Sequence, residues 1–148
     1  MIRRFDHVSF TVPSIDRAVA FWRDALGFRV DSDSVREGAF LGTVVGIAGA
    51  RARIAHLFGH GQHLEFIQYL EPAGGVAPPA PNDRCAGHVA FVTDDVETDV
   101  ARLTSAGATF QGRVARVTSG PYQGAAAVYL RDPNGVIVEL YQPAAGVP

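Results

Sequence analysis

The chain has 148 residues, a formal net charge of −2 and 47% hydrophobic residues. This length suits one domain or two small, closely packed modules, and the balanced charge argues against disorder and against a basic nucleic-acid binder. All 13 basic residues are Arg, which excludes chemistry that needs a lysine amine, such as Schiff-base catalysis or a P-loop. The single cysteine, Cys85, excludes an internal disulfide framework and a thiolate metal cluster.

The N-terminal segment is charged and is not followed by an apolar signal region. No apolar run approaches the roughly 18–20 residues that a membrane span requires. Together with the lone cysteine, these features predict a soluble cytoplasmic protein that binds neither nucleic acid nor membranes.

A repeat divides the chain into two halves. Residues 6–12 recur as residues 87–93, so that His7 aligns with His88 and Phe10 aligns with Phe91. Because the repeated segments occupy equivalent places, the two halves are expected to share one order of elements.

Each repeated segment predicts a strand, and each is followed by a helical pattern with a single apolar stripe. The first helix is predicted over residues 14–27 and begins at Ser14. The second is predicted over residues 94–107 and begins at Asp94 or Asp95. Gly27 and Gly107 end the two patterns.

Three strand-like runs follow each helix. In the first half they cover residues 28–35, 50–58 and 63–70, with a tight turn at residues 59–62 and an apolar segment at residues 38–49 that we interpret as a short helix. In the second half they cover residues 109–118, 125–131 and 136–142, with a turn at residues 132–135. Asp132-Pro133-Asn134-Gly135 is a strong turn sequence, since Pro fixes φ and Asn-Gly tolerates positive φ. Each half is therefore predicted as strand–helix–strand–strand–strand, in an α+β fold.

The boundaries follow from the same pattern. The first module is predicted over residues 1–70, a Pro-rich linker over residues 71–86 and the second module over residues 87–143. We expect the two modules to form one structural domain.

Two histidines and two glutamates carry the predicted chemistry. His7 and His88 lie on the first strand of each half, and Glu65 and Glu139 lie on the last, each within a strongly apolar run where an unpaired carboxylate is costly to bury. A single His or Glu on a strand more often packs or faces solvent. The presence of both residue types on matching strands of the two halves favours a shared role. If the strands line a concave sheet, the four side chains form a mixed N/O metal site suited to Zn²⁺, Ni²⁺, Co²⁺, Fe²⁺ or Mn²⁺.

The remaining candidates are weaker. His56, His60 and His63 surround the turn at residues 59–62 and are expected to be exposed rim residues rather than a second metal patch. Arg51 and Arg53 are expected to form surface ion pairs rather than to bind an anionic substrate. The four tyrosines are expected to pack, with a pocket-lining role left open: Tyr69, Tyr122, Tyr129 and Tyr141.

The repeat and its motifs strongly resemble the vicinal oxygen chelate superfamily. The resemblance covers almost the whole chain and rests on residues 5–8, 87–91 and 131–140, which include both histidines and Glu139. The superfamily includes glyoxalase I, methylmalonyl-CoA epimerase, extradiol dioxygenases, fosfomycin-resistance enzymes and bleomycin-binding proteins. It implies paired βαβββ modules that form an eight-stranded, open, barrel-like cup around a divalent metal, and a substrate that chelates the metal through two oxygens.

The resemblance also implies the ligand set: His7 and Glu65 from the first module, and His88 and Glu139 from the second. Dioxygenases and fosfomycin-resistance enzymes use two His and one Glu, and bleomycin-binding members lack the ligands. The set of four therefore resembles glyoxalase I or an epimerase. The segment at residues 49–56 does not resemble a lactoylglutathione lyase, so no glutathione substrate is assigned.

These features lead us to expect a metal-dependent isomerase, epimerase or lyase that abstracts a proton next to a carbonyl of a small substrate. Glu139 or Glu65 would act as the base, with Glu37 as a separate glutamate in an epimerase-like version of the mechanism. Two alternatives remain: a non-catalytic protein that binds an antibiotic or natural product, and an Fe²⁺-dependent extradiol-type dioxygenase. We expect a homodimer with each site inside one chain.

Overall fold

A computed structural model describes residues 1–75 and 77–146. The chain divides into two compact units, Met1–Ala77 and Pro78–Pro148. Over the described residues there are three helices, a four-stranded sheet in the first unit and a five-stranded sheet in the second. This confirms the predicted α+β class.

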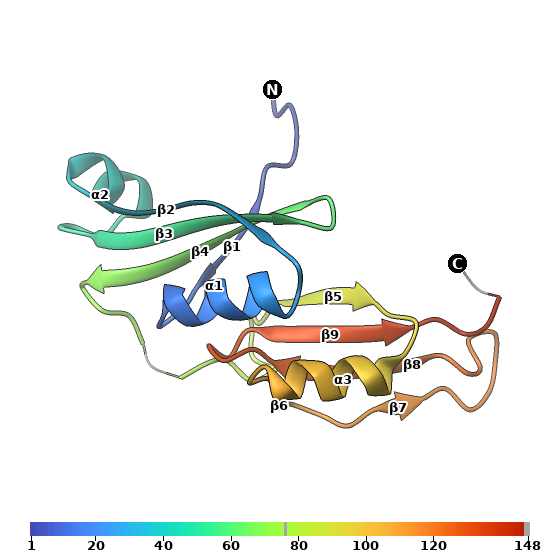
Figure 1. The fold of residues 1–148 in the computed structure, drawn as a ribbon. Helices are drawn as coiled ribbons and strands as arrows, with labels where there is room; N and C mark the ends of the chain where they lie inside the picture. The colour runs from blue at the N-terminus through green and yellow to red at the C-terminus, as the bar shows by residue number, and fades with distance from the viewer. Residues whose placement is uncertain (76, 147–148) are drawn as a thin grey trace. The chain divides into compact units, whose positions relative to one another are not determined.

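The first unit contains one sheet with the strand order β1-β4-β3-β2 (Figure 1). Strand β1 is parallel to β4, and the other neighbours are antiparallel. Its elements are β1 (Val8–Thr11), α1 (Ile15–Asp24), β2 (Arg29–Glu37), α2 (Ala39–Val45), β3 (Arg51–Gly59) and β4 (Gln62–Glu71). The short apolar helix predicted within residues 38–49 is confirmed as α2.

Helix α1 begins where its sequence predicts. The Ser14 side chain accepts a hydrogen bond from the Arg17 backbone N–H, which satisfies a donor that the first turn leaves free. Its buried stripe includes Trp22, whose ring lies 5.2 Å from that of Phe66 on β4. One face of the sheet is therefore the core face, and α1 covers it.

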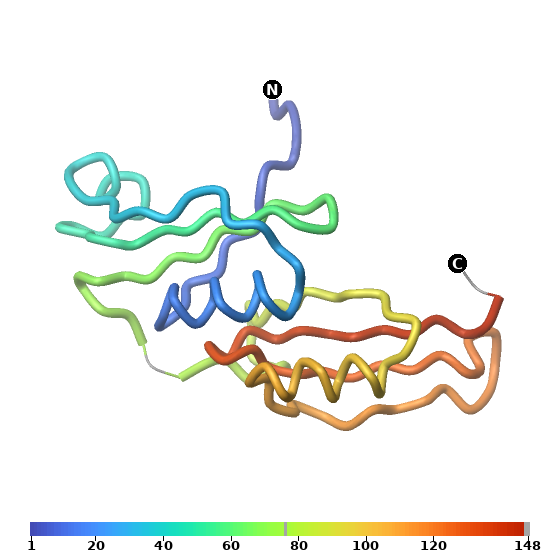
Figure 2. Tube along the Cα trace, in the orientation of Figure 1, coloured from blue at the N-terminus to red at the C-terminus, as the bar shows by residue number. Residues whose placement is uncertain are grey.

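The β3–β4 hairpin fixes which residues face each other in this sheet. His60 and Gly61 form its two-residue loop, and both have positive φ, as a tight turn that matches the twist of the strands requires. The His60 ring contacts the Leu26 carbonyl at 2.7 Å and anchors the turn. The green part of the trace in Figure 2 follows this hairpin, in which His56 pairs directly with Glu65.

The second unit repeats the arrangement, with strand order β5-β9-β8-β6 and β7 paired to β8. Strand β5 is parallel to β9, as β1 is to β4. Helix α3, which Asp95 caps, lies against β8 and β9 (Figure 1). The elements are β5 (His88–Val92), α3 (Val96–Ser105), β6 (Thr109–Phe110), β7 (Ala115–Arg116), β8 (Ala126–Arg131) and β9 (Ile137–Gln142).

One predicted strand is interrupted. Residues 109–118 were expected to form a continuous strand, but the structure contains only the short β6 and β7 there. The backbone N–H groups of Gln111 and Gly112 both donate to the Tyr129 carbonyl, so two residues face one on β8. Such an extra residue breaks the ladder as a bulge does, and an alternating sequence pattern does not reveal it.

Part of the predicted linker is fixed to the second unit. The Arg131 guanidinium donates to the carbonyls of Pro79 and Gly135, at 2.7 and 2.6 Å. A Cβ on Gly135 would lie 2.7 Å from that of Pro78, and Gly135 has φ +94, so this close approach requires glycine. None of the helices over residues 1–75 and 77–146 is long and apolar enough to cross a membrane.

Candidate metal centre

Glu65 and Glu139 occupy equivalent positions on β4 and β9. In each strand the two flanking residues are buried toward the helix, so the glutamate points to the opposite face of the sheet. The Glu65 side chain is 14% exposed and that of Glu139 is 21% exposed. Each carboxylate therefore needs a partner on the face opposite the helix that packs on its own sheet.

A glutamine three residues after each glutamate ties its strand to the helix. Oε1 of Gln68 accepts from the backbone N–H of Ile15 at 3.0 Å, and Oε1 of Gln142 accepts from that of Val96 at 3.1 Å. Both bonds reach the first turn of a helix, where backbone donors lack partners within the helix. The spacing Glu-x-x-Gln places the amide under the helix and the carboxylate on the other face. This repeated spacing is visible in the sequence, although the two glutamines are not among the predicted site residues.

Each glutamate lies beside the histidine predicted to share its site. In the first unit, Nε2 of His7 lies 3.6 Å from Oε1 of Glu65. In the second unit, Nε2 of His88 lies 3.1 Å from Oε2 of Glu139. In the parallel ladders, Glu65 pairs with Ser9 and Glu139 pairs with Ala90. In each unit the histidine lies two residues before the residue that pairs with the glutamate. The same register thus produces the same pair twice.

The other ring nitrogen of His7 is held by Asp6. Nδ1 of His7 lies 3.0 Å from Oδ2 of Asp6, and this hydrogen bond is the main reason that the pKa of Asp6 lies below its usual value. A carboxylate that accepts from one ring N–H leaves the second nitrogen with a free lone pair. Nε2 of His7, which faces Glu65, is thereby prepared to bind a metal.

His56 and His63 correct one of our expectations. They were expected to be exposed rim residues, but both are partly buried on the face that carries Glu65. Nε2 of His56 lies 3.6 Å from Oε2 of Glu65, and Nδ1 of His56 lies 3.0 Å from Nε2 of His63. The turn at residues 59–62 already implied this, because it places residue 56 opposite residue 65, and alternation places residue 63 on the same face.

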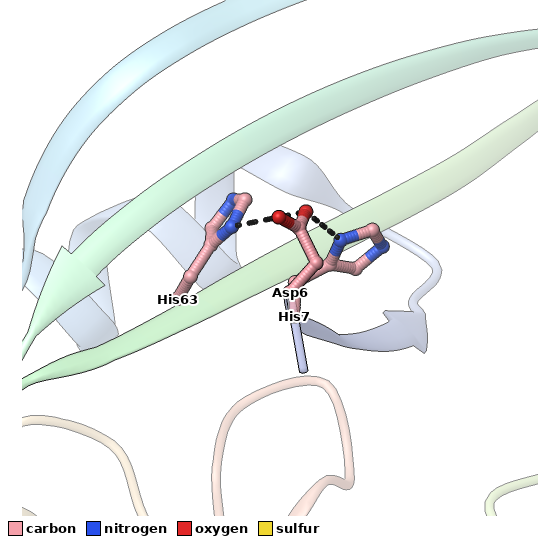
Figure 3. Close-up of side chains that lie close together, drawn as sticks. All are labelled: Asp6, His7 and His63. Carbon is pink, nitrogen blue, oxygen red and sulfur yellow. Dashed lines mark hydrogen bonds and ion pairs between the residues drawn. The ribbon is translucent and has the colours of Figure 1, made fainter. Parts of the chain in front are cut away.

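Asp6 also approaches His63. Nδ1 of His63 lies 3.9 Å from Oδ2 of Asp6, and the Asp6 carboxylate lies between the rings of His7 and His63 (Figure 3). Ligand atoms of these three residues all lie within 4.8 Å of one another, close enough to hold a metal ion. Asp6 is not among the residues that the sequence predicts for the site, because its role depends on the contact between the segment before β1 and His63 on β4.

Tyr129 lies beside the pair in the second unit. Its hydroxyl oxygen lies 3.4 Å from Nε2 of His88, and it pairs with Glu139 across β8 and β9. Burial raises the pKa of the Tyr129 hydroxyl, and the negative charge of Glu139 raises it further. Among the four tyrosines, Tyr129 thus lies next to the predicted ligands.

Glu37 lies elsewhere on the first sheet. It pairs with Arg51, whose Nε lies 3.0 Å from its Oε2, and its side chain is 67% exposed. Arg51 is five residues from His56 on β3, which places Glu37 about 17 Å along the sheet from Glu65 at roughly 3.3 Å per residue. Arg53 pairs with Asp33 and Asp16, so both arginines form the surface ion pairs expected of them.

Comparison with known proteins agrees with the architecture. A model of the Glyoxalase/Bleomycin resistance protein/Dioxygenase superfamily matches residues 4–140. The chain is 31% identical over 147 residues to a 2-epi-5-epi-valiolone epimerase from Actinomyces sp., with 96% of this chain and 80% of that protein covered. It is 26% identical to an ethylmalonyl-CoA/methylmalonyl-CoA epimerase from Cereibacter sphaeroides, with 96% and 99% covered.

A solved structure has the same fold. The crystal structure of a glyoxalase family protein from Bacillus cereus matches with a TM-score of 0.81 and 25% identity, and the match covers 98% of this chain and 97% of that one. The family model spans nearly the whole chain and both units. The chain therefore belongs to the glyoxalase/bleomycin resistance protein/dioxygenase superfamily, the vicinal oxygen chelate superfamily that its repeat resembles.

Proposed function

We propose that the protein is a metal-dependent epimerase, or a closely related isomerase or lyase, that removes a proton next to a carbonyl of a small substrate. The observation that carries this proposal is the repeated His–Glu pair, His7 with Glu65 and His88 with Glu139. Two relatives that match along 96% of this chain are named epimerases, which supports the same class of reaction.

The four side chains fit a divalent metal by their chemistry. Each pair brings a ring nitrogen and a carboxylate oxygen 3.1–3.6 Å apart, close to the roughly 3.0–3.4 Å between neighbouring ligands whose bonds to one ion are about 2.0–2.1 Å long. Two imidazoles and two carboxylates suit Zn²⁺, Ni²⁺, Co²⁺, Fe²⁺ or Mn²⁺. We propose that the two pairs converge on one such ion.

The metal would act as a Lewis acid toward a substrate carbonyl and make the adjacent C–H more acidic. His7 and His88 would bind as neutral imidazoles, with the tautomer of His7 set by Asp6. Glu65 contacts both His7 and His56 and would stay in place. Glu139 contacts His88 at one carboxylate oxygen, so it is our candidate for the base that takes the substrate proton.

Exchange of the substrate proton with solvent tests the proposed reaction. The purified protein, loaded in turn with each of the five metals, would be incubated in D₂O with 2-epi-5-epi-valiolone or methylmalonyl-CoA, the compounds in the relatives' names. We expect deuterium at the carbon next to the carbonyl with at least one metal and substrate, and none with Glu139→Gln. Full exchange by the metal-free protein, or by Glu139→Gln, would contradict the proposal.

A further inference from the structure

We propose that the first unit binds a divalent transition-metal ion at a site of its own, formed by Asp6, His7 and His63. Nδ1 of each histidine and a carboxylate oxygen of Asp6 would hold the ion, and we call these three residues the first-unit site. The site needs neither His88 nor Glu139. Two imidazoles and one carboxylate suit ions such as Zn²⁺, Co²⁺ and Fe²⁺, with the remaining positions open to water.

The β1–β4 ladder brings the two histidines together. Val8 at the start of β1 pairs with Leu64 on β4. His7 and His63 each precede that pair by one residue and therefore lie side by side, with ring centroids 5.2 Å apart. The Asp6 carboxylate lies between the two rings (Figure 3). Among the described residues, this is the only group of three potential ligands whose atoms all lie within 4.8 Å of one another.

The distances fit one ion. Oδ2 of Asp6 lies 3.0 Å from Nδ1 of His7 and 3.9 Å from Nδ1 of His63. Neighbouring ligand atoms whose bonds to one ion are about 2.0–2.1 Å long lie about 3.0–3.4 Å apart. The first separation is within this range and the second is longer. Because the Asp6 side chain is 52% exposed, its carboxylate has room to turn toward His63.

Neighbouring side chains orient these ligands. Oδ1 of Asp6 accepts a hydrogen bond from the Arg4 guanidinium at 2.8 Å, which leaves Oδ2 facing the histidines. Nε2 of His63 lies 3.0 Å from Nδ1 of His56. When Nε2 of His63 donates the hydrogen of this bond, its Nδ1 keeps the lone pair that faces Asp6. The ring of Phe58 stacks on that of His63, with centroids 4.2 Å apart, and holds its plane.

His7 links the first-unit site to the four-ligand centre. Its Nδ1 faces Asp6 and its Nε2 faces Glu65. A neutral imidazole has a lone pair on only one of its two nitrogens. An ion at the first-unit site takes the place of the hydrogen at Nδ1, and that hydrogen then lies on Nε2. The two centres therefore compete for His7.

A titration with Co²⁺ tests the first-unit site apart from the four-ligand centre. The full chain would carry His88→Gln and Glu139→Gln, both in the second unit, so that every side chain of the first unit stays unchanged. After removal of metal with a chelator, visible absorption and bound Co²⁺ per chain are measured during the titration. We expect one equivalent of Co²⁺ to bind. No binding of Co²⁺ by this folded variant would overturn the proposal.

Two further substitutions on that background identify the ligands. Asp6→Asn and His63→Gln are each expected to weaken Co²⁺ binding by more than about tenfold, because loss of a ligand costs more than loss of an outer partner. Asp31→Asn and His60→Gln are the matched controls and should keep the affinity of the background chain. Asp31 is 49% exposed in a surface ion pair, and His60 belongs to the same hairpin as His63 but contacts a backbone carbonyl. Unchanged affinity after either Asp6→Asn or His63→Gln, or an equal loss in the controls, would overturn the proposal.

His63→Gln in the otherwise unaltered chain separates this site from the proposed function, because it leaves all four residues of the four-ligand centre in place. If only the first-unit site is wrong, the chain with His88→Gln and Glu139→Gln binds no Co²⁺, and the chain with His63→Gln binds it as the wild type does. If only the four-ligand centre is wrong, the first of these chains keeps the wild-type affinity and the second loses it.

Discussion

In the second unit, Nε2 of His88 lies 3.1 Å from Oε2 of Glu139. The first unit repeats this relationship with His7 and Glu65: His88 begins β5, and His7 directly precedes β1. In both units the pair lies on the sheet face opposite the helix. The internal repeat thus duplicates a local arrangement of side chains as well as an order of helices and strands.

The His88–Glu139 pair is expected to contribute ligands to the four-ligand centre. Glu139→Gln should lower metal affinity by more than the about 10–100-fold that loss of an outer partner causes. Equilibrium competition with a chromophoric chelator measures this affinity. Glu97→Gln is the control, because Glu97 pairs with Arg116 on the surface of the same unit. Equal metal affinities of the Glu139→Gln and Glu97→Gln variants would contradict the role of Glu139.

Asp6 is expected to act through His7. Asp6→Asn removes the charge that favours an N–H at Nδ1 of His7 while keeping the size of the side chain. We expect the metal affinity to fall about 10–100-fold with little change in unfolding temperature. Nitrogen NMR of the imidazoles should show His7 shifting toward the tautomer protonated at Nε2. An unchanged tautomer together with unchanged affinity would contradict this role.

Tyr129 should report the charge of Glu139. Burial and the carboxylate together raise the pKa of the hydroxyl, so removing the carboxylate charge should lower it. Absorbance at high pH, compared between wild type and Tyr129→Phe, isolates this tyrosine from the other three. When the same comparison is made in chains that also carry Glu139→Gln, the titration of the Tyr129 hydroxyl should move to lower pH. A shift to higher pH would show that Glu139 does not act on Tyr129.

Gln142 is expected to stabilise the junction of β9 and α3. Gln142→Leu removes the acceptor of the part-buried Val96 N–H, which should cost about 1–3 kcal/mol because the donor is left without a partner. Urea unfolding of wild type and variant measures the loss. Gln123→Leu, in an exposed loop of the same unit, should change the free energy of unfolding by less than about 0.5 kcal/mol.

Asp95, the N-cap of α3, should make the free energy of unfolding depend on pH. The backbone N–H of Thr98 donates to Asp95, and this is the main reason that the pKa of Asp95 is lowered from 3.8. A group with a lowered pKa in the folded state stabilises the fold above its unfolded pKa and loses that effect as the pH falls. The stability difference between wild type and Asp95→Ala should therefore be constant near neutral pH and shrink below about pH 4. Unfolding curves at several pH values would show this, and a difference that grows in acid would contradict it.

Local patterns predicted most of the fold. Ser14 and Asp95 cap the helices, and positive φ at Gly27 and Gly107 follows each helix as the sequence indicates. Strand and helix boundaries depend on neighbouring residues, so they can be read locally. The break between β6 and β7 could not, because it depends on how two N–H groups share the Tyr129 carbonyl of another strand. The single domain and the homodimer stay predictions.

The sequence by itself determined the repeat, the α+β class and the two His–Glu pairs, because periodicity and matched spacing are properties of the chain. Only the tertiary structure decided the surroundings of these pairs. It brought Asp6, His56 and His63 around His7 and Glu65, and it left Glu37 with Arg51. The physical reason is register: pairing across the β3–β4 hairpin and the β1–β4 ladder sets which side chains meet on the face opposite α1, and no single strand contains that information.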